Sequence, residues 1–363
     1  MSEGLTSRRE MLVRGAGAMM AAGAAGTGAW VLHNVLGDAG LGEPTGGDVR
    51  LRNYFADIDF PASNPRISVA LGMQEQTDQM VRAAMGGLAP SLGMRRFVRP
   101  RDVVLVKPNV GFDRSPQLGA TTSPEVVRSV IRLCKEAGAH RIIVADNPVE
   151  APQACFAKSK IAEVADAEGA RVILPSQVDF RQVVVRDHAP DPSKGEALGR
   201  WPLLYTPLAD ADKVIGVAVI KDHSLCSASM NLKNWYGLLG GRRNQFHQAI
   251  QNIVSDLAMM MSPTLVIADA TRVMMTNGPT GGRLTDVKPG GELGRPAVVA
   301  SVDAVACDAW CYQHFLGRDP TALAYLDLAH RKISALIANG CRRLCERDWR
   351  TYDQQGKLLI TTL

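Results

Sequence analysis

The sequence predicts an α/β fold in which a parallel or mixed sheet is covered by helices on both faces, preceded by an N-terminal export signal. Two observations indicate this class. Short apolar runs are bounded by Gly, Pro or charged residues and lack the alternation of a half-exposed strand. Segments in which apolar residues recur at helical spacing separate these runs. Strands that are apolar on both sides and alternate with helices are typical of sheets buried on both faces.

The first half of the predicted domain alternates regularly. A buried strand is expected at 102–107, because an apolar run there ends at Pro108. The next helix begins with Ser123 as N-cap and Pro124 at its first position, and it ends at Gly138. The elements expected after it are a strand at 141–146, a helix at about 153–168, and strands at 171–174 and 183–185.

The second half continues the same alternation. A long buried strand is expected at 213–220, because eight residues there are almost all apolar. The other expected elements are helical stretches at about 228–239 and 246–261, strands at 265–268 and 297–300, and helices at about 303–316 and 322–338.

Residues 1–40 have the features of a twin-arginine export signal or membrane anchor. Arg8 and Arg9 precede 18 uncharged residues, Gly15 to Leu32, of which 12 are Gly or Ala. This stretch is long enough to span a bilayer but weakly hydrophobic, which favours the twin-arginine route over general secretion. Without a clear A-x-A cleavage site, retention as an anchor stays open, and the alternative is a chance arginine pair before a low-complexity tail.

Composition bounds the rest of the chain. Residues 41–64, rich in Gly, Pro, Asp and Asn, are predicted to be a linker, and 65–363 to form the α/β domain. The 41 Lys and Arg exceed the 36 Asp and Glu by only five, and aromatic residues make up 5%, so no nucleic-acid partner is expected. Seven cysteines are too few for a disulfide scaffold of this size.

Polar side chains follow four of the predicted strands. In open parallel sheets, ligands bind beyond the carboxyl ends of the strands. Lysines there suit an anionic ligand, whereas His and carboxylates suit proton transfer or metal ligation. The alternative is that each polar residue only begins a solvated loop. The residues at these strand ends are Lys107, Asn109, Asp146, Lys221, His223 and Asp269.

A second polar group lies just after the 213–220 strand. Asn231, Lys233 and Asn234 are close in sequence, and Gly237 permits close approach of the backbone. At a helix start they are expected to hold an anion, unless the asparagines serve only as caps. The sequence has no G-x-G-x-x-G and no Walker motif, so no dinucleotide cofactor is indicated.

Two cysteine pairs have helical spacing. Cys307 and Cys311 are four residues apart, and so are Cys341 and Cys345. If helical, each pair lies on one helix face, about 5–6 Å apart, which disfavours a disulfide within a pair. A four-thiolate metal site or a disulfide between the pairs stays open beside the alternative that these are buried apolar residues.

Six short motifs occur together in one order: Lys107-Pro108-Asn109, Thr122-Ser123-Pro124-Glu125, Lys221-x-His223, Asn231-x-Lys233-Asn234-x-x-Gly237, Gly278-Pro279 and Asp303-x-Val305-Ala306-x-Asp308-Ala309. Over about residues 100–320 this order resembles the family catalogued as domain of unknown function 362. The resemblance implies that the lysine, asparagine and histidine positions form one constellation, and it brings no settled activity. Many members carry a ferredoxin-like module with iron–sulfur clusters. This chain lacks that module, and it has Asp269-Ala270 where the family often has Asp-Gly.

The sequence therefore predicts an exported protein that binds a small anionic molecule or a cofactor at its strand ends. The lysines supply positive charge, the asparagines orient the ligand, and His223 transfers protons or ligates a metal. Two alternatives stay open: a metal- or iron–sulfur-dependent redox or maturation protein that uses the four cysteines, and a non-catalytic periplasmic accessory protein. The expected partners are the anion, the twin-arginine translocase during export and an exported redox partner, with N-terminal membrane anchoring left open.

Overall fold

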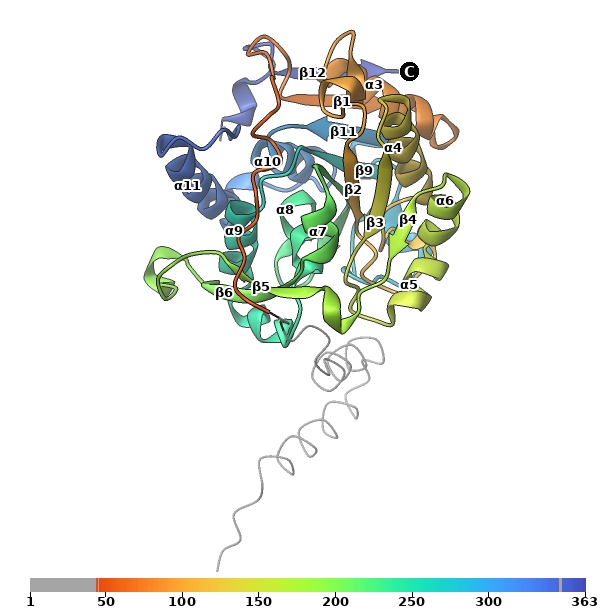
Figure 1. The fold of residues 1–363 in the computed structure, drawn as a ribbon. Helices are drawn as coiled ribbons and strands as arrows, with labels where there is room; N and C mark the ends of the chain where they lie inside the picture. Colours follow the sequence, from red (N-terminus) through yellow and green to blue (C-terminus); the bar gives the residue numbers. More distant parts are fainter. Residues whose placement is uncertain (1–43, 45, 346–347) are drawn as a thin grey trace, which may run out of the picture.

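A ten-stranded mixed sheet runs through the molecule (Figure 1). The computed structural model describes residues 44, 46–345 and 348–363. The predicted export signal, 1–40, lies outside these residues. The strand order is β12-β1-β11-β9-β7-β2-β3-β4, with β8 paired to β7 and β10 to β9. The bounds are β1 Ile67–Leu71, β2 Val103–Pro108, β3 Arg141–Ala145, β4 Arg171–Ile173, β7 Lys213–His223, β8 Ser227–Ser229, β9 Leu265–Met274, β10 Val287–Lys288, β11 Ala297–Ser301 and β12 Leu358–Thr362.

The sheet is parallel in its centre and antiparallel toward one edge. β4, β3, β2, β7 and β9 are parallel neighbours, whereas β11 is antiparallel to both β9 and β1. The mixed form of the predicted sheet is therefore confirmed. A separate two-stranded sheet is formed by β5, Phe180–Val184, and β6, Arg200–Leu204.

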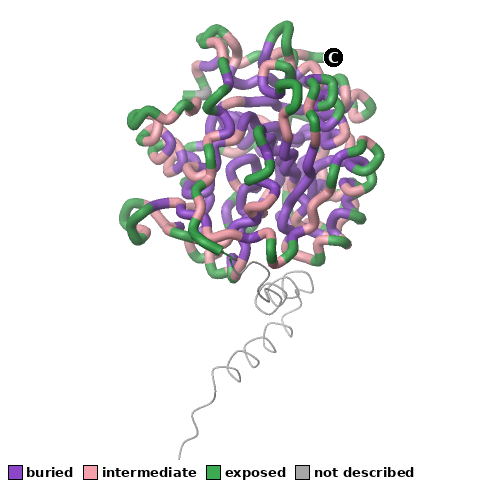
Figure 2. The backbone as a smooth tube through the Cα atoms, in the orientation of Figure 1, coloured by how far each residue is buried: buried purple, intermediate pink, exposed green. Residues whose placement is uncertain are grey.

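Helices cover both faces, as predicted (Figure 1). Alternate residues of each central strand enter different cores: Leu105 of β2 packs with one helix layer, and Val104 and Val106 with the other. Figure 2 shows this buried interior beneath an exposed shell of loops. One layer contains α3 Thr77–Leu88, α4 Pro124–Glu136, α5 Pro152–Lys158 and α6 Ile161–Ala167, and the other α8 Asn231–Asn234, α9 Ile250–Met260, α10 Ala304–His314 and α11 Ala324–Ala338.

Several helix predictions need correction. The helix expected at 153–168 is split into α5 and α6, because Lys160 takes a left-handed backbone with φ of 64°. The stretch expected at 228–239 begins with β8 and continues as the single turn α8 and a 3₁₀ helix. The stretch expected at 246–261 is a 3₁₀ helix until α9 begins. The predictions also omit β1, α3 and β12.

The segment predicted as a linker packs onto the domain. Within 46–64, Tyr54, Phe55 and Ile58 are buried, although the segment forms turns rather than helices or long strands. The Tyr54 hydroxyl donates to the carbonyl of Leu208 at 2.8 Å, in α7, Thr206–Asp210. The Gly and Pro residues of the segment 46–64 therefore belong to turns that pack against the domain.

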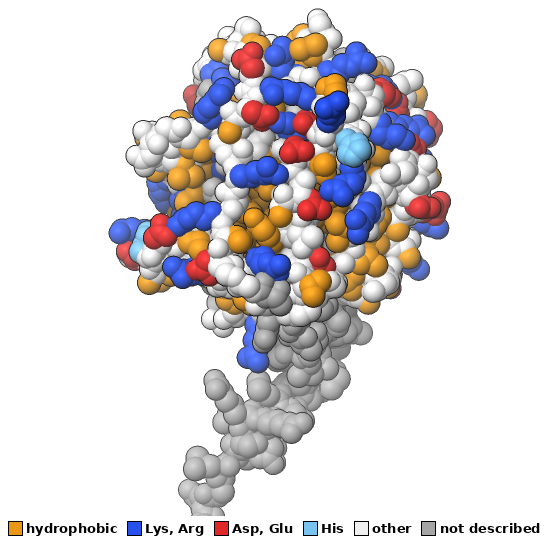
Figure 3. Space-filling view, in the orientation of Figure 1, with side chains coloured by type: hydrophobic (Ala, Val, Ile, Leu, Met, Phe, Trp, Pro, Cys, Tyr) orange, Lys and Arg blue, Asp and Glu red, His pale blue; other side chains and the backbone are white. Residues whose placement is uncertain are grey.

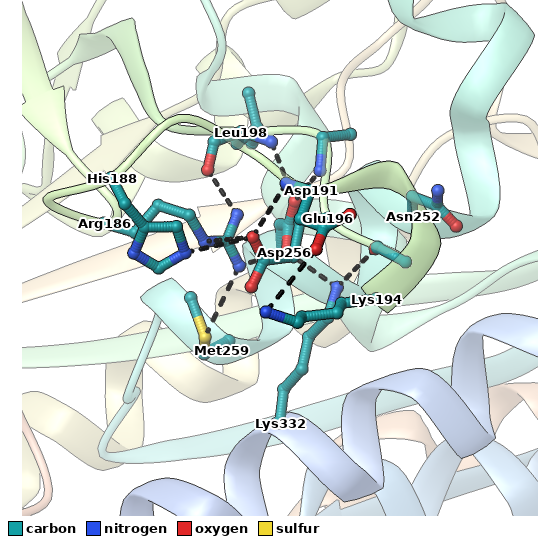
Figure 4. A network of polar contacts seen from close by, with 12 residues as sticks. Arg186, His188, Asp191, Lys194, Glu196, Leu198, Asn252, Asp256, Met259 and Lys332 are labelled. Carbon is teal, nitrogen blue, oxygen red and sulfur yellow. Dashed lines mark hydrogen bonds and ion pairs between the residues drawn. The ribbon is translucent and has the colours of Figure 1, made fainter.

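A buried ion-pair network fixes the connection between β5 and β6 (Figure 4). Arg186 and Lys332 place nitrogens 2.8 and 2.7 Å from one oxygen of Asp256 in α9. The other Asp256 oxygen accepts backbone N–H groups of Ala197 and Leu198. Since its charges are compensated, the network joins the β5–β6 connection to α9 and α11 and offers no open charge to a ligand.

The surface shows no patch of a single sign on the face drawn in Figure 3, where acidic and basic side chains intermingle. Within the part of the chain that the structure describes, no helix has the length and apolar character needed to cross a membrane.

Candidate functional site

An inner cavity of about 50 Å³ lies where the parallel strands β2, β3 and β7 end. By this measure a single water needs about 10–15 Å³, so the inner cavity takes only a few water-sized groups. Its wall includes six of the residues predicted from sequence: Asn109, Asp146, Lys221, His223, Lys233 and Gly237. Lys107, Asn231, Asn234 and Asp269 are not part of this wall.

A buried ion pair lies behind the inner cavity. Lys107 Nζ is 2.6 Å from Asp146 Oδ1 and donates to Asn234 Oδ1 and to the Pro108 carbonyl, each at 2.9 Å. Burial lowers the pKa of Lys107, and the Asp146 charge opposes that shift. Only glycine fits at position 237 without a shift, because a Cβ there would lie closer than 3.0 Å to both the Asp146 carboxylate and the Lys107 ammonium group. The charge of Lys107 is therefore balanced by Asp146 within the protein.

Lys221 reaches the inner cavity from the carboxyl-terminal part of β7. Its Nζ donates to Asn109 Oδ1 at 3.1 Å and to the Ala120 carbonyl, and it lies 4.9 Å from the centre of the Phe112 ring. Burial, followed by the positive charge of Lys233, lowers the pKa of Lys221 well below its ordinary value. The low-dielectric surroundings thus favour the neutral amine.

His223 ends β7 beside the same cavity and is 4% exposed. Burial, with the charges of Lys233 and Lys221, lowers the pKa of His223 well below its ordinary value. Its Nδ1 accepts the backbone N–H of Leu225 at 3.2 Å. In the neutral ring the proton therefore resides on Nε2.

Two further cations belong to the wall. Lys233 of α8 lies over the Tyr236 ring, with Nζ 4.9 Å from the ring centre. Burial is the main cause that lowers the pKa of Lys233. The Arg243 guanidinium donates to the carbonyls of Asn147, Leu239 and Pro148. Among the described residues, no carboxylate lies within 4 Å of either cation, so neither has a counter-ion in this part of the chain.

An outer pocket of about 470 Å³ adjoins the inner cavity, and Pro279 belongs to the walls of both. Residues 277–283 form most of the outer wall, together with Arg114, Ser224 and Asp286. The Asp222 carboxylate holds this loop in place, because it accepts the Gly278 N–H at 3.0 Å and an Arg318 N–H at 2.7 Å. The loop therefore closes one side of the inner cavity.

The remaining predicted polar residues have partners elsewhere. Asp269 accepts N–H groups of Ser123 and Thr271 and the Thr271 hydroxyl, so it fixes the start of α4. Asn231 donates from its backbone and its side chain to Asp308 of α10. Asp269 and Asn231 therefore position helices.

The structure does not bring the four cysteines together. Cys307 and Cys311 are buried in α10, whereas Cys341 and Cys345 follow α11 in non-helical chain. Cys341 and Cys345 are four residues apart but do not lie in a helix, so the helical arrangement considered for this pair is wrong. Over the described ranges, no three His, Cys, Asp or Glu residues are placed to hold a metal, and no two of the cysteines are joined in a disulfide.

The wall also contains eight residues outside the predicted site set: Gly111, Phe112, Asn147, Val149, Ser229, Tyr236, Arg243 and Pro279. Arg243 follows Arg242 and a pair of glycines, which is the local pattern of a solvated turn. Only the fold shows that its guanidinium is buried under backbone carbonyls. Pro279 lies in the Gly278-Pro279 motif, whereas Phe112 lies in a loop with no distinguishing pattern.

One family model matches the chain, and one curated relative is similar to it. Residues 104–313, more than half of the chain, match the family described as domain of unknown function DUF362. A thylakoid-associated protein of Synechocystis is 28% identical over 255 residues, which are 65% of this chain and 74% of the relative.

Two solved structures are distantly similar. The lactate racemase apoprotein from Thermoanaerobacterium thermosaccharolyticum has 13% identity and a TM-score of 0.33, over 60% of this chain and 52% of that one. A Thermotoga maritima protein has 11% identity and a TM-score of 0.33, over 71% and 59%. The chain thus spans little more than half of either structure. The match over 104–313 makes this chain a member of the DUF362 family.

Proposed function

We propose that the protein binds a small anionic molecule in the inner cavity and exchanges a proton with it through His223. The observation that carries this proposal is the positive charge of Lys233 and Arg243 in the wall, for which the described residues supply no carboxylate within 4 Å. The Lys107–Asp146 pair is neutral as a unit, so it does not cancel that charge. Arg243 is buried and Lys233 is partly buried, so holding both cations without a counter-ion is costly, and an anion recovers part of that cost.

The proposed anion also changes the protonation of its surroundings. Burial and the neighbouring Arg243 charge lower the pKa of Lys233, and a bound anion opposes both effects. Binding is therefore expected to take up protons when Lys233 or Lys221 is partly neutral. A small carboxylate, which has two acceptor oxygens, fits a wall that offers Lys and Arg donors.

His223 is the proposed proton-transfer group. The Leu225 N–H occupies Nδ1, which leaves Nε2 to carry and exchange the proton. Its lowered pKa keeps the ring neutral near pH 7, so it acts first as a donor through Nε2–H or takes a proton only transiently. Lys221, also in the wall, receives the other end of the ligand.

Isothermal titration calorimetry with acetate and inorganic phosphate tests the binding proposal. Lys233→Met is expected to weaken acetate binding about tenfold or more, because one charge-assisted hydrogen bond contributes about 1.5–3 kcal/mol. The matched control is Lys288→Met, which removes an exposed lysine outside both pockets with the same change in net charge. Equal acetate affinity in the Lys233 variant and the wild type would refute this site.

We also propose that the chain is exported by the twin-arginine route. The support is the Arg8-Arg9 pair before a weakly hydrophobic stretch, together with the relative that is described as thylakoid-associated. Cell fractionation of the wild type and an Arg8→Lys/Arg9→Lys variant tests this. Export is expected to be lost in the variant, whereas equal export of both would contradict the proposal.

A further inference from the structure

The described part of the chain has three lysines that are almost completely buried: Lys107, Lys213 and Lys221. Lys107 pairs with Asp146 at 2.6 Å, and Lys213 with Asp57 at 2.5 Å. Lys221 differs, because none of the described carboxylates lies within 4 Å of its Nζ. A buried ammonium group without a counter-ion is strongly disfavoured, so the neutral amine is the form that suits this site.

The contacts of Lys221 match those of a neutral amine. Its Nζ has two oxygen acceptors, Asn109 Oδ1 and the Ala120 carbonyl, which use the two N–H bonds of an –NH₂ group. The nitrogen lone pair is then left without a partner. The Phe112 ring, 4.9 Å away, and the Asp146 charge favour a cation, but burial, followed by the charge of Lys233, acts in the opposite direction and outweighs them.

Lys221 also belongs to the wall of the inner cavity, together with His223 and Lys233. A desolvated lysine beside a second cation is the arrangement that makes an amine nucleophilic at neutral pH. We propose that Lys221 forms an imine with the carbonyl group of a small oxo acid whose carboxylate binds Lys233. This inference rests on the proposed anion site and names the class of its ligand.

The chemistry of this step balances without an external oxidant or reductant. The Nζ lone pair attacks the carbonyl carbon to form a C–N bond, and the carbonyl π electrons move to oxygen. His223 Nε2–H donates a hydrogen bond to that oxygen as its negative charge forms, and a proton passes from the now cationic Lys221 nitrogen to the oxygen, which yields a carbinolamine. A further proton transfer then lets the C–O bond break with loss of water, which leaves an imine between the Lys221 nitrogen and the carbonyl carbon.

Reductive trapping on the unaltered full chain tests the inference. The protein is incubated at pH 7 with pyruvate or glyoxylate and sodium cyanoborohydride, and peptide mass spectrometry maps the reduced adduct. Each unit by which the pKa of an amine falls raises its neutral fraction about tenfold near pH 7. Lys221 is therefore expected to be modified at least about tenfold faster than any exposed lysine, and than the ion-paired Lys107 and Lys213.

Two controls separate this inference from the anion site itself. Acetate carries the same charge but no reactive carbonyl, so it is expected to slow the labelling of Lys221 by competition. Lys221→Arg is expected to lose the adduct. Acetate binding that depends on Lys233, without preferential labelling of Lys221, would overturn the imine and leave the anion site standing. No binding of either compound would overturn both.

Discussion

Replacing Gly237 with alanine directly perturbs the buried polar group behind the inner cavity. A Cβ at this position would lie 2.9 Å from Lys107 Nζ and closer than 3.0 Å to Asp146 Oδ1. Neither group is free to move, because Asp146 Oδ2 accepts the Val110 N–H at 2.7 Å and Lys107 donates to Asn234. The added methyl group must therefore push the ion pair apart or displace the turn.

The expected loss of stability follows from these contacts. Separating a buried ion pair costs about 3–5 kcal/mol when one charge is left without its partner. A Gly-to-Ala change recovers about 0.4–1 kcal/mol by restricting the unfolded chain. Gly237→Ala is therefore expected to lower the free energy of unfolding by about 2–4 kcal/mol.

Urea denaturation of the wild type and the variant measures this difference. The matched control is Gly86→Ala in α3, because nothing lies within 4 Å of a Cβ at that exposed position. The control is expected to gain about 0.5–1 kcal/mol from better helix propensity. A Gly237 variant as stable as the wild type would refute the reasoning, since it would show that the ion pair tolerates the methyl group.

Three further predictions concern buried charge. Burial raises the pKa of Asp308 to about 7, so between pH 4 and 7 the unfolded chain releases a proton that the folded chain retains, and stability falls as pH rises. Asp308→Asn is expected to remove this pH dependence, about 4 kcal/mol in all, from the free energy of unfolding measured with urea. A free energy of unfolding that still falls with pH as in the wild type would contradict this prediction. Burial lowers the pKa of His247 to about 4, so the free energy of unfolding falls as the pH drops from 6.5 to 4. His247→Gln is expected to make this fall smaller in thermal unfolding. A dependence on pH as steep as that of the wild type would argue against this prediction. Lys332→Met is expected to cost about 1–3 kcal/mol by urea denaturation, because Asp256 keeps Arg186 as a partner; a loss within 0.5 kcal/mol would show that Arg186 suffices.

Much of the fold was predictable because the central strands are continuous apolar runs. β2, β3, β7 and β11 are buried on both faces, and their sequences show it directly. β12 was missed because Leu358–Thr362 is an edge strand whose pairing with β1 spans almost the whole chain. The helix predicted at 153–168 failed at Lys160, since a left-handed lysine has no sequence signature.

The candidate site was only partly predictable, because the partners of its polar residues come from distant parts of the sequence. Strand ends indicated where Lys221 and His223 lie, and the parallel pairing of β2, β3 and β7 brings such ends to one edge. The sequence did not reveal that Asn234 binds Lys107 or that Asn231 binds Asp308, because each partner comes from a distant segment. Local pattern identifies polar residues at a sheet edge, but the tertiary fold decides which of them keep an open charge.

The central claim, that the inner cavity binds a small anion, is tested most directly by anomalous diffraction from crystals grown in bromide, with and without acetate. If the inner cavity binds a small anion, a bromide peak is expected within contact distance of Lys233 Nζ and the Arg243 guanidinium. Acetate is expected to displace that peak. Bromide peaks confined to surface arginines, with none in the inner cavity, would contradict it.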